Sequence, residues 1–337
     1  MRVPKKWFRV TPHGLYCIPG DFYIDPIAPV PRAIISHGHS DHAFAGHKEV
    51  IAHPATCAIM QSRYGADYTQ QECPLFYYDA IDLNGLTLYL LPAGHVLGSA
   101  QIVMEYEKSR VIFSGDYKKV LDPTCEAFAV MSCQVFITEA TFALPIFNHP
   151  AIETELEKLL NSMTTFPNRS HLLGVYGLGK CQRVIKTLRN MGYLHPIYLH
   201  EGLRKICELY SQFGIELGEL PSANKLTKQS AQGKLILCPP SALHDRWSRR
   251  FTAPVVSMAS GWMQIRARAK QKGIELPLII SDHADWNDLI NTIKEINPEE
   301  VWVTHGREEA LVYHLNQLGY QAQALHLLGY EEHKGYE

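Results

Sequence analysis

Short apolar runs separated by turn residues fill the first 141 positions of this 337-residue chain. Residues 7–24 alternate apolar and polar side chains between prolines and glycines, which predicts two or three antiparallel strands. The apolar run 32–36 predicts a buried strand, and Pro54 opens a predicted helix at a position that suits its missing N–H group. We expect a further short helix over residues 43–47.

Two hairpins follow in the same part of the chain. Asn84-Gly85 is a strong hairpin turn between two apolar stretches. A second hairpin joins residues 100–107 to residues 110–113, and residues 135–138 form one more apolar strand. The first part of the chain is therefore predicted to be rich in β-structure.

From about residue 150 to residue 275 the pattern changes to an alternation of helices and strands, which predicts a small doubly wound α/β unit. The strand 170–175 is followed by a glycine-containing turn and by Lys180 at the start of a helix. This arrangement suits phosphate, because the N–H groups of a helix start and a cation converge there. Further strands are expected at 277–280, 300–303 and 321–327, with helices at 285–296 and 307–318.

The stretch His37-Gly38-His39-Ser40-Asp41-His42 places four metal-capable side chains within six residues, directly after a predicted strand. Imidazole nitrogen suits zinc, and carboxylate oxygen suits zinc or manganese. The motif can therefore divide its ligands between two ions, with His37 and His39 on one ion and Asp41 and His42 on the other. An isolated histidine is usually a packed core residue, but this spacing is not explained in that way.

Further side chains with metal-binding or acid–base chemistry stand where predicted strands end: Asp25, His95, Asp116, Glu139, His283 and His305. Asp116 follows Ser114-Gly115, and an aspartate in such a position suits a bridging ligand because each carboxylate oxygen can face one ion. The sequence thus predicts a metal centre built from segments that lie far apart along the chain.

Composition restricts the class of protein. The chain is 46% hydrophobic and 20% charged, which is typical of a globular protein. No apolar run reaches 18 residues, and the basic start leads into no apolar signal segment, so we expect no membrane partner and a cytoplasmic location. The eight cysteines form no C-x-x-C pair, which indicates reduced thiols and not a disulfide framework.

Charge is unevenly distributed along the chain. The net charge of -2 argues against a general nucleic-acid binder. However, residues 142–276 carry twice as many basic as acidic side chains, and the remainder is acidic overall. A basic middle segment suggests a phosphate-binding surface beside the predicted metal centre, although a solvated face without such a role would have the same composition.

Together, the motif over His37–His42 and the other strand-end residues resemble the metallo-β-lactamase superfamily over nearly the whole chain. The resemblance implies an α/β protein with an αββα sandwich and a dinuclear metal site at one sheet edge. More than half of the chain separates Asp116 from His305, and the segment between them resembles the β-CASP insertion of nucleic-acid-processing members. We therefore expect a metallo-β-lactamase domain in two parts, 1–141 and 277–337, and an inserted β-CASP domain over 142–276.

Short motifs strengthen the resemblance to the β-CASP nucleases. Glu139, His283 and His305 are similar to the residues of motifs A, B and C, in that order. Ser260-Gly261-Trp262 is similar to the Thr-Gly-Trp, and Gly179-Lys180 to the Gly-Lys, of the crosslink-repair and Artemis nucleases. The pairing of Tyr-Gly-Leu-Gly-Lys-Cys-Gln-Arg with Ser-Asp-His-Ala-Asp-Trp most resembles the bacterial DNA ligase-associated exonucleases.

This resemblance implies a metal-dependent DNA exonuclease, a phosphodiesterase that acts in DNA repair or end processing in functional association with a DNA ligase. Analogy with the crosslink-repair branch suggests a 5′-to-3′ direction. A histidine at motif C, as His305 provides, usually marks RNA-type members, so an RNA-processing ribonuclease is the alternative. A small-molecule metallohydrolase of the thioesterase or lactonase type is a third reading, and it predicts no role for the cations of the insertion.

The resemblance also implies roles for the site residues. Two divalent ions, zinc first and manganese as the alternative, would share Asp116 as a catalytic bridging ligand. His37, His39 and His95 would bind one ion together with Asp116. Asp41, His42 and His305 would bind the other ion, and Asp41 is also expected to be catalytic. Asp25 would orient a ligand histidine, and His283, oriented by Glu139, would be the general acid. Substrate contacts are expected from Lys180, Tyr176, Ser260, Trp262, Arg266 and Arg268.

Overall fold

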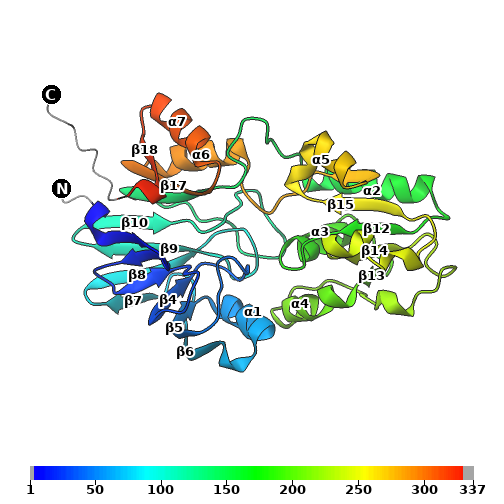
Figure 1. Cartoon of the computed structure of the whole chain (residues 1–337), viewed down its shortest axis with the longest axis horizontal. Coiled ribbons are helices and arrows are strands. Elements are labelled where there is room, and N and C mark those ends of the chain that lie inside the picture. The colour runs from blue at the N-terminus through cyan, green and yellow to red at the C-terminus, as the bar shows by residue number, and fades with distance from the viewer. Residues whose placement is uncertain (1–3, 329–337) are drawn as a thin grey trace. The chain divides into compact units, whose positions relative to one another are not determined.

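The computed structural model describes residues 4–328 (Figure 1). The chain forms two compact units. Unit 1 reaches Leu121, resumes over Glu126–Ile146 and begins again at His283. Unit 2 consists of Asp122–Cys125 and Phe147–Asp282. The chain thus leaves unit 1, builds most of unit 2 and returns to complete unit 1.

Unit 1 contains two sheets, of which the first has six strands in the order β1-β2-β3-β4-β5-β6. The strand bounds are Phe8–Thr11, Gly14–Cys17, Phe22–Ile24, Arg32–Ile35, His47–Ala52 and Thr69–Pro74. The strands β1 to β3 pair antiparallel, as the alternation of residues 7–24 predicts. The strands β3 to β6 pair parallel, so their carboxyl ends lie at one edge of this sheet.

The second sheet of unit 1 has seven strands in the order β18-β17-β11-β10-β9-β8-β7. The bounds of β7 to β11 are Ala80–Leu83, Leu86–Pro92, Ala100–Tyr106, Ser109–Phe113 and Val135–Ala140, and β17 and β18 span Glu300–Gly306 and Gln321–Ala324. Both predicted hairpins are present, since β7 pairs with β8 and β9 with β10 in antiparallel register. Asn84 and Gly85 both adopt positive φ, which suits the tight turn between β7 and β8.

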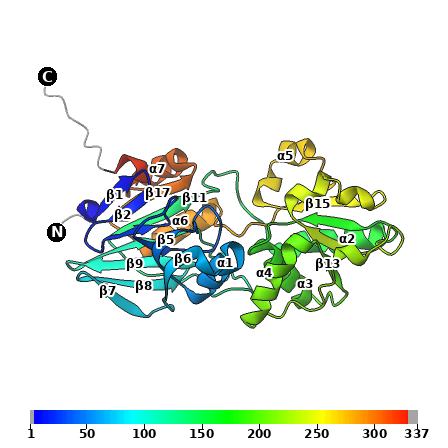
Figure 2. The same cartoon turned by 60° about the horizontal axis from the view of Figure 1, so that its bottom comes forward.

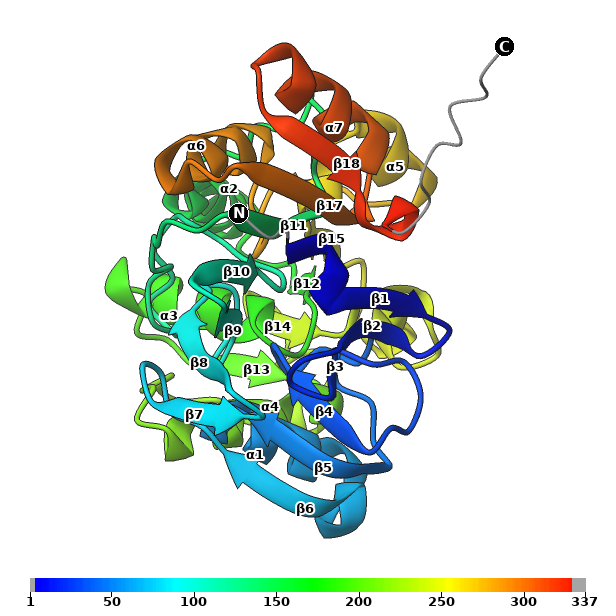
Figure 3. The same ribbon diagram turned by 90° about the vertical axis from the view of Figure 1, so that its left-hand side faces the viewer.

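Unit 1 is an αββα sandwich, in agreement with the predicted fold class. A central core between the sheets joins Ile34 of the first sheet to Ile102 and Trp302 of the second. Because side chains alternate along a strand, Val103 faces the other way and packs with α6 (Trp286–Ile296) and α7 (Glu308–Gln317). Figure 3 shows α7 beside β17 and β18. The helix α1 (Pro54–Tyr64) packs on the outer face of the first sheet through Cys57 and Met60.

Unit 2 is a small doubly wound α/β unit, as its alternating pattern predicts (Figure 2). Its five strands pair parallel in the order β13-β14-β12-β15-β16. The strands β12 to β16 span His171–Gly174, Ile197–Leu199, Leu235–Cys238, Val255–Ala259 and Leu276–Leu278. The helices α2 to α5 span Ile152–Thr165, Lys180–Asn190, Glu201–Gln212 and Arg266–Gln271.

One local expectation was wrong, and one strand was not expected. Residues 43–47 form no helix, because the turn after His42 ends at Gly46 with a φ of 94° and His47 already begins β5. The strand β6 was not predicted, because Thr69–Pro74 is largely polar and exposed at the edge of its sheet. Within residues 4–328, no helix combines the length and apolar character that crossing a membrane requires.

Candidate metal centre

The candidate centre is assembled at the ends of strands from both sheets of unit 1. The strand β4 ends at Ile35 and passes into the His37–His42 loop. In the second sheet, His95 follows β8 and Asp116 follows β10. Glu139 lies in β11 and His305 lies in β17, and these two strands and β10 are parallel. Parallel strands place their carboxyl ends at one edge, which explains how residues distant in sequence meet.

Three histidine nitrogens converge at the core of the centre. His39 Nδ1 lies 3.1 Å from His37 Nε2 and 3.0 Å from His95 Nε2. Asp116 Oδ2 lies 3.5 Å from His37 Nε2 and 3.8 Å from His95 Nε2. Donor atoms around a tetrahedral zinc ion with bonds of about 2.1 Å are about 3.4 Å apart, so this donor set fits such an ion.

Asp116 lies among several imidazole rings. Its Oδ2 is 3.4 Å from His42 Nε2 and 3.9 Å from His283 Nδ1. Burial alone would raise the pKa of Asp116, but the surrounding histidines, led by His42, hold its pKa well below the usual range. Burial opposes protonation of His42, whereas Asp116 and Asp25 raise the pKa of His42 well above its usual value. Buried carboxylates that draw a proton onto a histidine would equally stabilise a metal cation.

Asp25 holds the start of the ligand loop. Its Oδ2 lies 2.8 Å from His42 Nδ1, and its two oxygens accept from the Ser36 backbone N–H at 2.7 Å and the Ser36 hydroxyl at 2.5 Å. The Ser36 hydroxyl is also 3.1 Å from His37 Nδ1. Ser36 is a residue that sequence reasoning missed. Its signal was its position between the strand and the first ligand-capable histidine.

Asp41 and His305 lie further from the converging nitrogens. The Asp41 side chain is 75% exposed, and its Oδ2 is 4.0 Å from His42 Nε2. The His305 ring is exposed, and its centroid is 4.7 Å from that of His42. His305 also has a φ of 52°, an unusual value for a residue other than glycine. These residues surround His42 and do not join the compact group of His37, His39, His95 and Asp116, whose ligand atoms lie within 4.8 Å of one another.

His283 lies beside this group and contacts the buried carboxylate of Glu139. The distance from His283 Nδ1 to Glu139 Oε2 is 3.0 Å. Glu139 Oε1 accepts the backbone N–H of Tyr117 at 2.8 Å, which fixes the carboxylate in place. Lys118 donates to the backbone oxygen of His283 at 3.2 Å. His283 is therefore held at both its ring and its backbone, while its side chain keeps 18% of its surface exposed.

The expected substrate contacts all lie in unit 2 and differ in exposure. Lys180 is buried, and its ammonium lies 2.9 Å from Asp282 Oδ1 and 4.9 Å from the ring centre of Tyr176, which is 54% exposed. The neighbouring Arg183 is also buried and donates to the Ser281 backbone oxygen at 2.5 Å. Lys180 and Arg183 therefore hold the peptide Ser281-Asp282.

The remaining expected contacts cluster after β15. Ser260 is buried, and its hydroxyl accepts the backbone N–H of Trp262 at 3.3 Å. The Trp262 ring packs edge-on against Phe147 and lies 4.1 Å from the guanidinium carbon of Arg268. Arg266 begins α5, and its side chain is exposed. Of this group, Arg266 and Arg268 present cations at the surface of unit 2.

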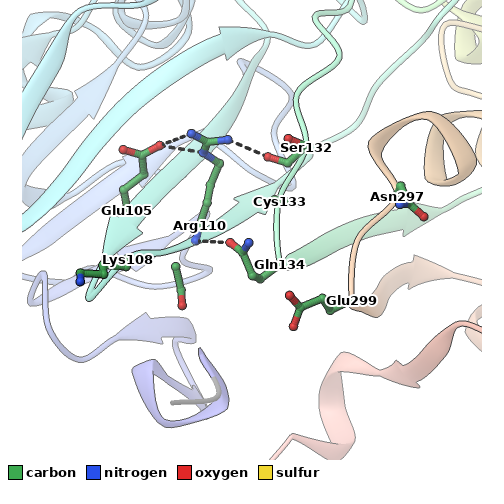
Figure 4. Close-up of a pocket in the computed structure, with 9 residues that line it drawn as sticks. Glu105, Lys108, Arg110, Ser132, Cys133, Gln134, Asn297 and Glu299 are labelled. Atoms are coloured by element: carbon green, nitrogen blue, oxygen red, sulfur yellow. Dashed lines mark hydrogen bonds and ion pairs between the residues drawn. The ribbon is translucent and has the colours of Figure 1, made fainter. Parts of the chain in front are cut away.

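A pocket of about 410 Å³ lies elsewhere in unit 1 (Figure 4). Its lining includes Ser109, which begins β10, and Gln134, which precedes β11, so it lies at the opposite ends of these strands from Asp116 and Glu139. Arg110 in this pocket is paired with Glu105 at 2.6 Å and donates to the Ser132 backbone oxygen. Its charge is thus balanced within the pocket, and the pocket is separate from the candidate centre.

A family model and a solved structure match this chain. Residues 277–324 match a family model described as a Zn-dependent metallo-hydrolase RNA specificity domain. The fold is similar to that of a solved protein of unknown function from Enterococcus faecalis, with a TM-score of 0.56 and 14% identity over 87% of this chain and 79% of that chain. The family-model match and the relatives described next support the resemblance to the β-CASP nuclease branch of the metallo-β-lactamase superfamily.

Particular relatives carry different descriptions. A probable DNA ligase of Opitutus terrae is 29% identical over 95% of this chain, which spans 31% of that protein. The endoribonuclease YSH1 of Saccharomyces cerevisiae is 31% identical over 39% of this chain and 18% of its own length. An RNase J-like protein of Methanocaldococcus jannaschii is 22% identical over 82% of both chains. The chain thus spans about a third or less of the first two relatives.

Proposed function

We propose that the chain is a metal-dependent DNA exonuclease that hydrolyses phosphodiester bonds. The observation that carries this proposal is the placement of His283 and Glu139, a candidate proton donor and its partner, beside the converging donors of His37, His39 and His95. A metallohydrolase that cleaves a poor leaving group needs both parts. The geometry supports this function better than it supports metal binding alone.

Two divalent ions, with zinc first, would share Asp116. His37, His39 and His95 would hold one ion, and Asp41, His42 and His305 would hold the other. Such ions activate water as a nucleophile and offset charge on the phosphoryl oxygens. Asp25 keeps the His42 ring oriented through its Nδ1 atom. The carboxylates around the centre thus serve both to hold charge and to fix the rings.

His283 would act as the general acid. Glu139 binds Nδ1, which leaves Nε2 as the ring nitrogen that delivers a proton to the departing oxygen of the sugar. A nearby carboxylate favours the protonated imidazole, and such a positioned proton transfer is worth roughly 10²–10⁴ in rate. Glu139 is itself held by the Tyr117 backbone N–H, so the acid is positioned before substrate binds.

DNA is the proposed substrate, and end processing together with a DNA ligase in the cytoplasm is the proposed setting. Support comes from the relative described as a probable DNA ligase, because nearly the whole of this chain aligns with it. We also propose that unit 2 is the β-CASP insertion and that Arg266 and Arg268, with Tyr176, contact the strand there. Exposed cations of this kind bind phosphates without reading sequence.

RNA is the second candidate substrate, and specific observations favour it. The family model over residues 277–324 is described by RNA specificity, and two relatives are described as an endoribonuclease and an RNase J-like protein. His305 lies within the matched segment, and a histidine at this motif C position resembles the RNA-processing members of the family. The two candidates share the same chemistry and differ only in the sugar that the site accepts.

The decisive experiment gives the purified protein, with zinc or manganese, end-labelled single- and double-stranded DNA and RNA. The proposal predicts metal-dependent release of mononucleotides from DNA, faster than from RNA. Faster cleavage of RNA would establish the second candidate. Cleavage of none of the four substrates, with activity on thioesters or lactones instead, would overturn both. Labelling each end in turn gives the direction of digestion.

A further inference from the structure

Two large aromatic side chains are exposed in the turn between β6 and β7. Phe76 is 60% exposed and Tyr78 is 65% exposed, and they stand on either side of the half-buried Tyr77. Both belong to unit 1, the unit that carries the candidate metal centre. Exposed rings in a monomer need an explanation when they are neighbours, because their burial by a ligand would be favourable.

The turn is held rigidly against the second sheet. The Tyr77 hydroxyl donates to the Ser99 backbone oxygen at 2.9 Å, and the Tyr78 N–H donates to the Leu90 backbone oxygen at 2.9 Å. The Tyr77 ring stacks on His53 at a centroid distance of 4.2 Å, and the His53 ring meets Phe76 edge-on at 6.3 Å. The rings of Phe76 and Tyr78 therefore extend from a fixed base.

The same turn is attached to the loop that carries His95. Ser99, which accepts from Tyr77, also accepts the His95 backbone N–H at its hydroxyl, at 3.1 Å. Thr56 at the start of α1 donates to the Gly98 backbone oxygen of the same loop at 2.8 Å. One short loop thus connects the exposed aromatic turn to a candidate metal ligand.

Tyr78 adopts a backbone conformation that costs free energy. Its φ is 68°, a region that bulky residues rarely occupy and that favours glycine. A turn selected only for stability would have glycine, asparagine or aspartate here. Retaining a tyrosine at this position indicates that the ring itself is useful, because strain of this kind concentrates at functional sites.

We infer that Phe76 and Tyr78 form a stacking platform for unpaired bases of a nucleic-acid strand whose backbone enters the candidate metal centre. The inference rests on the proposed nuclease function. Every base offers a flat face, and stacking on an aromatic side chain is tolerant of sequence. Base stacking needs exposed rings on a rigid support, as this turn provides. A docking protein would instead need a much larger continuous apolar surface.

The test compares binding of two probes by the full chain without metal, so that no cleavage intervenes. One probe is an oligothymidylate, and the other is an abasic strand of equal length with the same phosphates. The wild type is expected to bind the oligothymidylate about 100-fold more tightly, since stacking on each of the two rings is worth about 10-fold or more. Phe76→Ala and Tyr78→Gly should each remove about 10-fold of this preference and leave abasic binding unchanged.

Tyr78→Gly also separates function from folding, because glycine relieves the positive φ. Its midpoint of thermal unfolding should equal or exceed that of the wild type while the base preference falls. Tyr78→Phe should keep the preference. The matched control is Tyr313→Ala on α7, which removes another tyrosine of 69% exposure. This variant should bind both probes with the affinity of the wild type.

Adding zinc to the same samples separates failure of the stacking platform from failure of the nuclease proposal. If the wild type cleaves both probes but Phe76→Ala and Tyr78→Gly keep the full preference for bases, the stacking platform is refuted and the nuclease remains. If the wild type shows no preference for bases at all, the platform is equally refuted. If neither probe is cleaved while the variants lose base preference, the DNA exonuclease proposal fails and the rings still bind bases.

Discussion

At the scale of single residues, the geometry distinguishes the ring proposed to transfer a proton from the rings proposed to bind metal. His283 contacts Glu139 at 3.0 Å and keeps 18% of its side chain exposed, whereas His37 and His95 are fully buried against Asp116. Burial lowers the pKa of His37 well below its usual value, which suits a neutral metal ligand. His37 is therefore suited to bind metal in its neutral form, while His283 keeps part of its side chain open to solvent.

His283→Ala should retain metal and lose roughly 10²–10⁴ in the rate of DNA cleavage, because the leaving oxygen is no longer protonated. The loss should shrink to less than about tenfold on a p-nitrophenyl ester of thymidine phosphate, whose leaving group needs no proton. Metal content by mass spectrometry and rates on both substrates measure this. Glu139→Gln should follow the same pattern more weakly. Loss of bound metal in His283→Ala would show that the ring is a ligand instead.

His39→Ala should remove one of three converging nitrogens and lower zinc affinity by at least the 10- to 100-fold seen for changes to partners of metal ligands. Zinc competition with a chromophoric chelator measures the affinity, and cleavage should fall with occupancy. The matched control is His326→Ala, a surface histidine paired with Glu308, which should bind zinc as the wild type does. Equal affinity in His39→Ala would remove His39 from the centre.

At the scale of elements, helix α3 anchors a peptide of unit 2 through charges. The ammonium of Lys180 lies 2.9 Å from buried Asp282, so Lys180→Met would leave that carboxylate beside an apolar group. Breaking one side of a buried pair costs about 3–5 kcal/mol, and urea unfolding should show a loss of that order. Arg204→Ala, which breaks an exposed pair with Glu208 on α4, should cost less than about 1 kcal/mol. Equal losses in the two variants would contradict the assigned role of Lys180.

Helix α1 begins on a histidine cap that works only when the ring is neutral. His53 Nδ1 accepts the Ala55 backbone N–H at 3.2 Å, and burial lowers the pKa of His53 to about 4. In the unfolded chain His53 has its ordinary pKa near 6.5, so as the pH falls the unfolded state binds the proton before the folded state does. Stability from this group is full above pH 6.5 and falls as the pH drops toward 4.

His53→Asn keeps a capping acceptor and removes the titration. Between pH 7.5 and pH 5, the wild type should lose about 2 kcal/mol more stability than this variant. Urea unfolding of both proteins without metal, at the two pH values, gives the difference directly. Parallel pH profiles for the two proteins would mean that His53 is not buried as a neutral cap.

At the scale of the whole molecule, the parts that follow local rules were predictable. Strands, hairpins and the doubly wound unit come from apolar periodicity and from turns such as Asn84-Gly85. Potential ligands could be recognised because each follows or ends a strand, and parallel strands bring such positions to one edge. The short helix expected over residues 43–47 failed because Gly46 adopts a positive φ that no local count of apolar residues reveals.

Features that depend on distant contacts could not be read from the sequence. Lys180 looked like a phosphate-binding residue at a helix start, but its burial depends on Asp282, about one hundred positions later. The exposure of Phe76 and Tyr78 could not be predicted from their apolar segment alone. Its exposure follows from its place at the end of two sheets, which only the assembled strand order defines.

The metal centre is tested most directly by titrating metal-free protein with zinc. Bound zinc and strand cleavage are then measured in the same samples. We predict that release of labelled nucleotide from single-stranded DNA rises with bound zinc, and that His37→Ala neither reaches the wild-type zinc content nor cleaves. Cleavage that persists at full rate in metal-free protein, or in His37→Ala, would contradict the metal centre and the function built on it.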